Sequence, residues 1–435
     1  MKKCIALLLV CAALWGLTGC SASTADKLYS LPQLPEQYIR LQALIDSEIA
    51  AGSEFAAPTA GSWRQSVQLN DLDGDGEDEA LAFFRGEDAV LRICIYRSNG
   101  GDYSPACVIE GEGSSIGSIE YADLDGDGFS ELIVAWQVGS GLRMLRAYAL
   151  TGWQGSVLLT TDCTEFLVFD LDGDGQNELI TLRFEGAEGG SVSLHRFQAG
   201  QDPTTVSARL SRGLEAVMRI RTGYLSDMAP ALFVESSLSG GAQLLTDVFA
   251  CDGDLLRNLS AGNDGISDTV RSQNVYCADI DNDKIMEIPE LTPLPRQSET
   301  EYYVLDWFTY DTQGVRRPDI STYHCYGDGW FMRLPEGWRD VLTIRRDDGA
   351  SGEQAVVFSA LDADTGEIID FLKIYTLTGE NRHDRAHQGA RFVLVEDSTT
   401  IYAARILDTQ ALQVTEEEVR SHFSVIVSEW MSGAL

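Results

Sequence analysis

The chain is organised around one stretch, Asn70-Asp71-Leu72-Asp73-Gly74-Asp75-Gly76-Glu77-Asp78-Glu79-Ala80. Nearly the same loop recurs at residues 123–131 and 170–178, and a looser copy lies at 279–287. Each copy has an acidic residue at positions one, three, five and nine of a nine-residue loop. This spacing lets a tight turn aim several hard oxygens at one hard cation, for which calcium is the natural candidate.

We number these loops by the repeat that contains them, so residues 71–79 are loop one, 123–131 loop two, 170–178 loop three and 279–287 loop five. The predicted calcium ligands are the four acids of each loop and the backbone carbonyl at position seven. They are Asp71, Asp73, Asp75, Glu77 and Glu79; Asp123, Asp125, Asp127, Phe129 and Glu131; Asp170, Asp172, Asp174, Gln176 and Glu178; and Asp279, Asp281, Asp283, Ile285 and Glu287. A solvated acidic turn is the alternative. However, carboxylates about 5 Å apart repel by roughly 3 kcal/mol per pair at an effective dielectric of 20.

The loops are not EF-hands, because that motif closes with a glutamate at position twelve. Position twelve is Ala82, Val134 and Thr181 in the first three loops. Apolar, β-prone runs enter and leave each of these loops, so each loop is predicted to form the bend of a β-hairpin.

An acidic D-x-D-G-D-G-x-x-E loop between two strands resembles the FG-GAP and VCBS-type repeats of β-propellers. The first aspartates lie at 71, 123, 170 and 279, and a four-stranded blade needs about the spacing of the first three. The resemblance implies a mainly β fold, a β-propeller of about five four-stranded blades followed by a small α+β domain. We expect blades at residues 65–110, 116–163, 164–210, 216–260 and 273–325.

The repeats are not expected to bind the cation equally. Residues 222–230 stand where the fourth loop should be, and they lack the spaced acids. Loop five keeps its acids but has Lys284 at position six, where loops one to three have glycine for the sharp turn. The sequence therefore predicts weaker binding at loop five and none in the fourth repeat.

The N-terminus predicts export and lipid anchoring. Two lysines precede the apolar run 5–14, which is too short to span a bilayer. The following Leu17-Thr18-Gly19-Cys20 resembles the lipobox of bacterial lipoproteins, a family in which the cut precedes the cysteine and a lipid is attached to its sulfur. The resemblance implies an extracytoplasmic protein held to the bacterial cell membrane through lipid on Cys20. An ordinary secretory peptide is the alternative.

Four segments are expected. They are a signal peptide at 1–19, a lipidated tether with an amphipathic helix at 20–60, the propeller at 61–325 and the α+β domain at 326–435. In the last of these, the capping box Thr415–Glu418 predicts a helix that includes Val419, Phe423 and Trp430. The formal net charge of −35 argues against nucleic acid as a partner.

The cysteine and histidine motifs give less information about function. Removal of the signal peptide and lipidation of Cys20 leave six cysteines, of which Cys94 and Cys107 could be cross-strand neighbours, although buried free thiols are at least as compatible with this chain length. His383 and His387 lack the glutamate of a zinc-protease motif and fall in a polar stretch predicted to be a solvated loop.

Two classes of function remain. The first is a membrane-anchored calcium-binding module that presents a face to an unknown protein or carbohydrate ligand, without catalytic residues. The second is a propeller-scaffold enzyme acting on polysaccharide, as a lyase or a glycosidase. A structural envelope protein is a further possibility, which is hard to separate from the first class. A polar pocket away from the acidic loops would help to discriminate between them.

Overall fold

The computed structural model describes residues 36–139, 141–238, 240, 243–272, 275–295, 300–349, 351–362, 364–408 and 412–426. The predicted signal peptide, Cys20, residues 21–35 of the tether and Trp430 of the predicted C-terminal helix lie outside these residues. The fold is mainly antiparallel β-sheet. It divides into two compact units, Met1–Ser118 with Thr151–Gly155, and Ile119–Leu150 with Ser156–Leu435. Within the described part of the chain, no helix is both long and apolar enough to cross a membrane.

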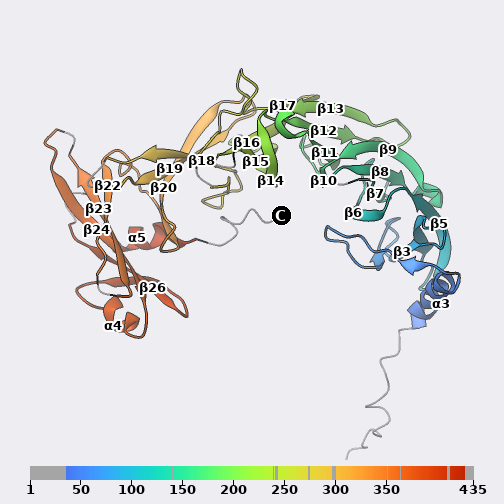
Figure 1. Ribbon diagram of the computed structural model, residues 1–435, viewed down its shortest axis with the longest axis horizontal. Helices are drawn as coiled ribbons and strands as arrows, with labels where there is room; N and C mark the ends of the chain where they lie inside the picture. Colours follow the sequence, from blue (N-terminus) through green and yellow to red (C-terminus); the bar gives the residue numbers. More distant parts are fainter. Residues whose placement is uncertain are drawn as a thin grey trace, which may run out of the picture. The chain divides into compact units, whose positions relative to one another are not determined.

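The first unit contains the predicted amphipathic helix and the first repeated sheet (Figure 1). Its elements are α3 (Glu36–Ala50), β1 (Glu54–Phe55), β2 (Val67–Asn70), β3 (Glu79–Arg85), β4 (Leu91–Arg97), β5 (Ser104–Gly111) and the 3-10 turn η1 (Thr151–Trp153). The strand order is β1-β3-β4-β5, and β2 also pairs with β3. Leu41 and Ile45 on α3 are buried with Ala82 and Phe84 of β3, so the helix packs on this sheet as predicted.

Three four-stranded sheets follow, each with its strands in sequence order. The first has β6 (Ser115–Ala122), β7 (Glu131–Gln137), β8 (Arg143–Ala149) and β9 (Ser156–Cys163). The second has β10 (Glu165–Phe169), β11 (Glu178–Phe184), β12 (Gly190–Arg196) and β13 (Thr204–Arg209), with the 3-10 turn η2 (Gly186–Glu188). The third has β14 (Leu214–Tyr224), β15 (Pro230–Leu238), β16 (Leu244–Asp252) and β17 (Leu255–Asn258). These sheets match the segments expected for the second, third and fourth repeats, except that β6 begins one residue and β14 two residues earlier than expected.

The second strand of each repeat is the most deeply buried. Strands β3 and β7 are buried along all but their last residue, because both of their faces are covered, and this explains their continuous apolar runs. The outer strands β9 and β13 are largely exposed. Consecutive sheets of the second unit share hydrophobic clusters, as where Leu194 is buried with Leu232, and Phe233 with Phe308.

The fifth sheet differs from the prediction in its composition. It contains β18 (Ile288–Pro293), β19 (Tyr303–Tyr310), β20 (Arg316–Cys325), β21 (Trp330–Arg333) and β27 (Phe423–Val425), in that order. Strand β21 pairs with β20 across the boundary expected after Cys325, so the sheet continues into the predicted C-terminal domain. Before loop five, where the other loops are preceded by a strand, the described residues form the isolated bridge Ala278↔Glu287.

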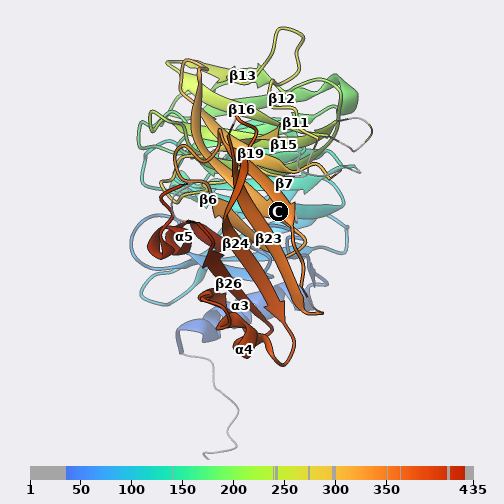
Figure 2. The same ribbon diagram turned by 90° about the vertical axis from the view of Figure 1, so that its left-hand side faces the viewer.

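The C-terminal segment forms the expected antiparallel sheet with small helices. Its elements are β22 (Leu342–Arg346), β23 (Glu353–Leu361), β24 (Ile368–Thr378), α4 (Arg382–Ala386), β25 (Phe392–Glu396), β26 (Thr400–Ile406) and α5 (Glu416–His422). The sheet order is β22-β23-β24-β26-β25, and Figure 2 shows β23, β24 and β26 side by side. Phe358 of this sheet is buried in one cluster with Trp330 of the fifth sheet, and so the two sheets share a core.

Two local predictions in this segment were wrong. Thr415 does cap α5 by accepting the Glu418 N–H, but the helix stops at His422 and Phe423 begins β27. Pairing with β21 and burial of the Phe423 ring against Trp330 outweigh helix propensity there. His383 lies in the short helix α4 instead of a loop, and its carbonyl is 2.9 Å from Nδ1 of His387. Neither histidine belongs to a metal-binding group among the described residues.

The six described cysteines are free thiols. Cys94 on β4 pairs with Val108 of β5, whereas Cys107 pairs with Ile95. Because neighbouring positions on a strand point to opposite faces, the Cys94 and Cys107 side chains are on opposite faces of the sheet. This register explains why they form no cross-strand disulfide.

Candidate metal centre

Each acidic loop folds around its first aspartate. In loop one, Asp71 accepts the N–H of Gly74 at 2.8 Å and that of Gly76 at 3.0 Å. Asp123 and Asp170 make the equivalent two bonds in loops two and three. Gly74 and Gly76 have φ of 73° and 88°, in the left-handed region that glycine adopts without strain.

The glutamate at position nine reaches back beneath each loop. It is the first residue of β3, β7 and β11 in loops one to three, and it accepts the N–H of position two at 3.0, 2.8 and 2.8 Å. Glu287 accepts the Ile280 N–H at 2.9 Å in the same way. All four glutamates are buried. The sequence identified these residues, but their burial under the loop follows from the hairpin register, as in the pair Asn70↔Glu79.

Burial makes these glutamates hard to ionise without a cation. Desolvation, with added repulsion from neighbouring aspartates, raises the pKa of Glu79, Glu131 and Glu178 from 4.5 to about 7 and that of Glu287 to about 8. Among the described residues, Oε1 of Glu131, Oε1 of Glu287 and Oδ1 of Asp281 are buried without a hydrogen-bond partner. A buried anionic oxygen without a partner is costly, and a bound cation would supply the missing interaction.

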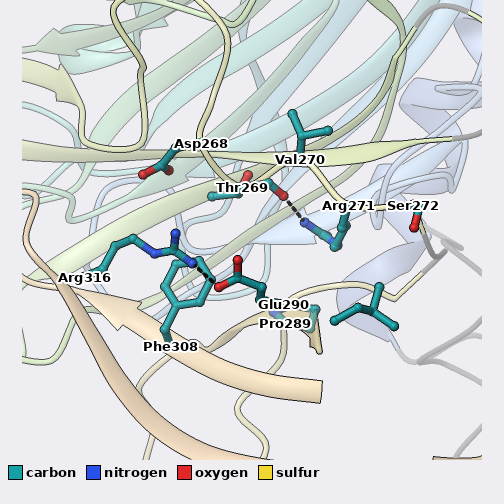
Figure 3. A pocket seen from close by; sticks show the side chains of 10 residues that line it. Asp268, Thr269, Val270, Arg271, Ser272, Pro289, Glu290, Phe308 and Arg316 are labelled. Atoms are coloured by element: carbon teal, nitrogen blue, oxygen red, sulfur yellow. Dashed lines mark hydrogen bonds and ion pairs between the residues drawn. The ribbon is translucent and has the colours of Figure 1, made fainter. Parts of the chain in front are cut away.

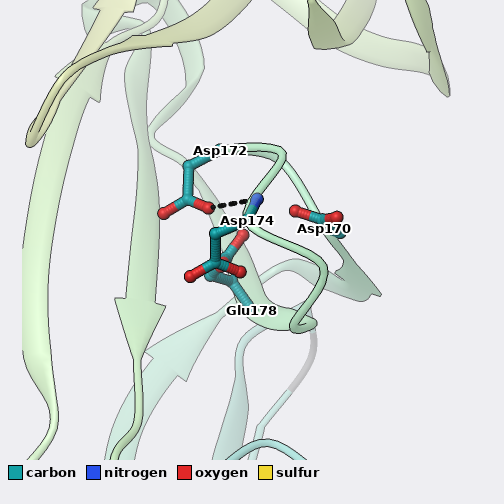
Figure 4. A group of neighbouring side chains, drawn as sticks. All are labelled: Asp170, Asp172, Asp174 and Glu178. Atoms are coloured by element: carbon teal, nitrogen blue, oxygen red, sulfur yellow. Dashed lines mark hydrogen bonds between the residues drawn. The ribbon is translucent and has the colours of Figure 1, made fainter.

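The acids converge most completely in loop three (Figure 4), where ligand atoms of Asp170, Asp172, Asp174 and Glu178 all lie within 4.8 Å of one another. The other loops bring three acids within the same limit. These groups are Asp71, Asp73 and Glu79; Asp123, Asp125 and Asp127; and Asp279, Asp281 and Glu287. Asp75, Glu131 and Asp283 fall outside the groups of their loops. Donor sets made only of carboxylates fit a hard cation such as calcium and suit thiolate-seeking metals poorly.

The side chains of Glu77 and Gln176, both at position seven, make hydrogen bonds outside their own loops. The Glu77 carboxylate accepts the Ser98 hydroxyl at 2.8 Å and the Gly100 N–H at 2.7 Å, and these bonds lower its pKa. The Gln176 amide donates to the carbonyls of Leu124 and Phe197. The role of the Glu77, Phe129, Gln176 and Ile285 carbonyls as ligands stays a prediction.

Loop five keeps the shape of the others although it lacks both glycines. Asn282 has φ of 67° and Lys284 φ of 78°, and the Lys284 N–H donates to Asp279 at 2.9 Å, as Gly76 does to Asp71. A side chain in this conformation costs roughly 1–2 kcal/mol, although Asn tolerates it better than Lys. The structure thus supports the physical reason given for a weaker loop five.

Arg196 contacts loop three, and the sequence did not reveal this contact. Its Nε lies 2.7 Å from Oδ2 of Asp172, and its guanidinium also reaches Cys251 Sγ and the Asp254 carbonyl. Arg196 is the last residue of β12, so only the pairing of β12 with β11 brings it to the loop. It offsets one of the four negative charges, consistent with the closer approach of the acids in loop three.

A pocket of about 170 Å³ is lined by residues that are not part of the acidic loops, although Pro289 follows loop five closely in the chain (Figure 3). Arg271 lines it and is itself buried in an ion pair with Glu235 at 2.8 Å. At its rim, the Arg316 guanidinium lies 3.6 Å over the Phe308 ring and 2.8 Å from Glu290. Asp268, also at the rim, accepts the Tyr310 hydroxyl. Glu290, Phe308 and Arg316 also line a neighbouring pocket of about 440 Å³.

Comparisons with known proteins give a family for one segment. A model of the FG-GAP-like repeat matches residues 71–134, which confirms the predicted repeat for loops one and two and the strands between them. The search of curated proteins found no match.

Solved structures of enzymes are similar at a low level. A periplasmic gluconolactonase of Pseudomonas aeruginosa is 14% identical, with 73% of this chain and 93% of that one covered and a TM-score of 0.29. A Bacteroides uniformis protein provisionally assigned as a 6-phosphogluconolactonase is 10% identical, with coverages of 72% and 86% and a TM-score of 0.29. An exo-β-1,3-galactanase of Phanerochaete chrysosporium is 11% identical, with coverages of 78% and 82% and a TM-score of 0.25. Similarity at this level assigns no activity to the chain.

Proposed function

We propose that the protein is an extracytoplasmic calcium-binding lipoprotein, anchored through Cys20, whose β-sheets present a binding face to a protein or carbohydrate ligand. The observation that carries the calcium part is the buried glutamate beneath each acidic loop. Four such glutamates have raised pKa values, and two of them have an oxygen without a partner among the described residues. A divalent cation that neutralises each loop accounts for all four.

Calcium suits these loops better than magnesium. Each loop offers four carboxylates and backbone carbonyls around a flexible turn, whereas magnesium requires near-octahedral geometry and gives up its waters reluctantly. When bound, calcium supplies charge neutralisation and a fixed hairpin bend. Asp71, Asp73, Asp75 and Glu79 would hold the ion in loop one, and the equivalent acids would hold it in the other loops.

The pocket around Arg316 offers a place for a ligand. It combines charged side chains, Glu290 paired with Arg316 and Asp268 with Tyr310, with the Phe308 ring. Polar groups beside an aromatic ring suit a polar ligand such as a carbohydrate. The pocket therefore supports a ligand-binding module and gives no specific support to a lyase or glycosidase.

Isothermal titration of calcium into the full-length chain in detergent, after EDTA treatment and dialysis, tests the calcium part. We expect saturable binding with dissociation constants of about 10⁻⁴ to 10⁻³ M, typical of extracellular modules, and weaker binding of magnesium. The matched control replaces the exposed position-five acids Asp75, Asp127, Asp174 and Asp283 by lysine, which places an ammonium at each site. Binding heat that persists unchanged in this control would contradict the proposal.

A further inference from the structure

The backbone of loop two is held from two sides at Leu124, the residue between Asp123 and Asp125. Its N–H donates to Glu131 of the same loop at 2.8 Å. Its carbonyl accepts the side-chain amide of Gln176, which belongs to loop three. One peptide segment of loop two thus depends both on its own buried glutamate and on a residue from the neighbouring loop.

Gln176 is also fixed within loop three. Its backbone N–H donates to Asp174 at 2.8 Å, and its carbonyl is the predicted position-seven ligand. Its side-chain amide has a second acceptor, the Phe197 carbonyl at 3.3 Å. Any cation that orders the loop-three backbone at Gln176 therefore also orders the amide that holds Leu124.

The other position-seven residues do not make this link. Glu77 bonds to Ser98 and Gly100, which belong to the same sheet as loop one. Phe129 and Ile285 have no polar side chain. Gln176 also packs close to Gly126 of loop two, where an added Cβ would make an ordinary van der Waals contact with Gln176 Oε1 at 3.6 Å.

From this geometry we propose that loops two and three are a coupled pair of cation sites, in which a cation at loop three strengthens binding at loop two through the Gln176 amide. The inference rests on the proposed calcium binding. By linkage, a cation at loop two strengthens loop three by the same factor. A single hydrogen bond of this kind corresponds to a coupling of about fivefold, at the low end of measured couplings between sites.

The test is a thermodynamic cycle on the full-length chain, with calcium as the probe. Loops one and five are silenced by Asp75→Lys and Asp283→Lys in every protein. The affinity of loop two is then compared with loop three intact and with loop three silenced by Asp172→Asn and Asp174→Asn, because the amide oxygen at 174 can still accept the Gln176 N–H. The same comparison is repeated with Gln176→Leu, which removes the amide but keeps a similar volume.

We expect loop two to bind about fivefold more tightly when loop three is intact, and this ratio to fall to about one in Gln176→Leu. A ratio near one in the chain with Gln176, or an unchanged ratio in Gln176→Leu, overturns the coupling while leaving calcium binding intact. If no loop binds calcium, the proposed function fails as well. Should Gln176→Leu not fold, Gln176→Glu replaces it, because a carboxylate cannot donate to the Leu124 carbonyl.

Hydrogen exchange gives a second readout that a purely structural role of Gln176 would not move. With loop two silenced by Asp127→Lys, calcium at loop three should slow exchange of the Asp125 amide, which follows the Leu124 carbonyl. The effect should disappear in Gln176→Leu. Equal calcium-dependent protection in both proteins contradicts the proposal.

Discussion

Replacing Glu131 by glutamine isolates the charge beneath loop two. The side chain is fully buried, and burial followed by repulsion from Asp125, Asp127 and Asp123 raises its pKa from 4.5 to about 7. Glutamine keeps an oxygen to accept the Leu124 N–H but cannot ionise. The variant therefore differs from the natural chain mainly in one negative charge.

The sign of the effect depends on pH and on calcium. Because the pKa is raised on folding, the stability associated with Glu131 is present below pH 4.5 and lost as the pH rises through about 7. By pH 8 this rise in pKa lowers the free energy of unfolding by about 3 kcal/mol. Without calcium, Glu131→Gln should thus be more stable than the natural chain by up to this amount at pH 8 and nearly equal to it at pH 4.5. With excess calcium the order should reverse, since the variant lacks a charged ligand.

Urea unfolding in EDTA and in 10 mM calcium (about ten times a dissociation constant of 10⁻³ M), at both pH values, measures these differences. The exposed Glu417→Gln is the control and should change stability little under any of these conditions. The reasoning is refuted if Glu131→Gln is no more stable than the natural chain at pH 8 in EDTA.

Three further predictions concern backbone strain, loop three and the anchor. Gly76→Ala should weaken calcium binding by about 1 kcal/mol through backbone strain alone, because its Cβ would meet no atom within 4 Å. Lys284→Gly should strengthen calcium binding for the same reason. Calcium titration of both variants measures these effects, and equal changes of the same sign would contradict the prediction. Arg196→Gln should loosen loop three in EDTA by unbalancing Asp172, seen as faster local hydrogen exchange, and unchanged exchange would count against it. Cys20→Ser should release the protein from the membrane fraction and abolish labelling by fatty acid, and persistent labelling would remove the lipoprotein proposal.

Local signals in the sequence predicted the repeated sheets well. Spaced acids and glycines locate each hairpin bend, and apolar runs locate β3, β7 and β11, because both are set by residues close together in the chain. The convergence of Asp170, Asp172, Asp174 and Glu178 follows from the same local spacing.

Features that depend on distant pairing were missed. Phe423 joins the fifth sheet across nearly a hundred residues from Met332, and its helical pattern does not reveal this. Arg196 and Gln176 reach loops three and two only through strand register and sheet packing. Arg196 belongs to no motif, and the loop motif assigns Gln176 only a carbonyl role, so neither the contact of Arg196 with Asp172 nor that of Gln176 with Leu124 could be predicted.

The central claim is that the acidic loops bind calcium and that this binding stabilises the fold. The most direct test is the melting temperature of the full-length chain at pH 7.5 in EDTA and in millimolar calcium, beside the variant with lysine at position five of all four loops. At ten times the dissociation constant, each occupied loop adds roughly 1.4 kcal/mol. Calcium should raise the melting temperature of the natural chain and leave that of the variant unchanged. Equal melting temperatures of the natural chain in EDTA and in calcium would contradict it.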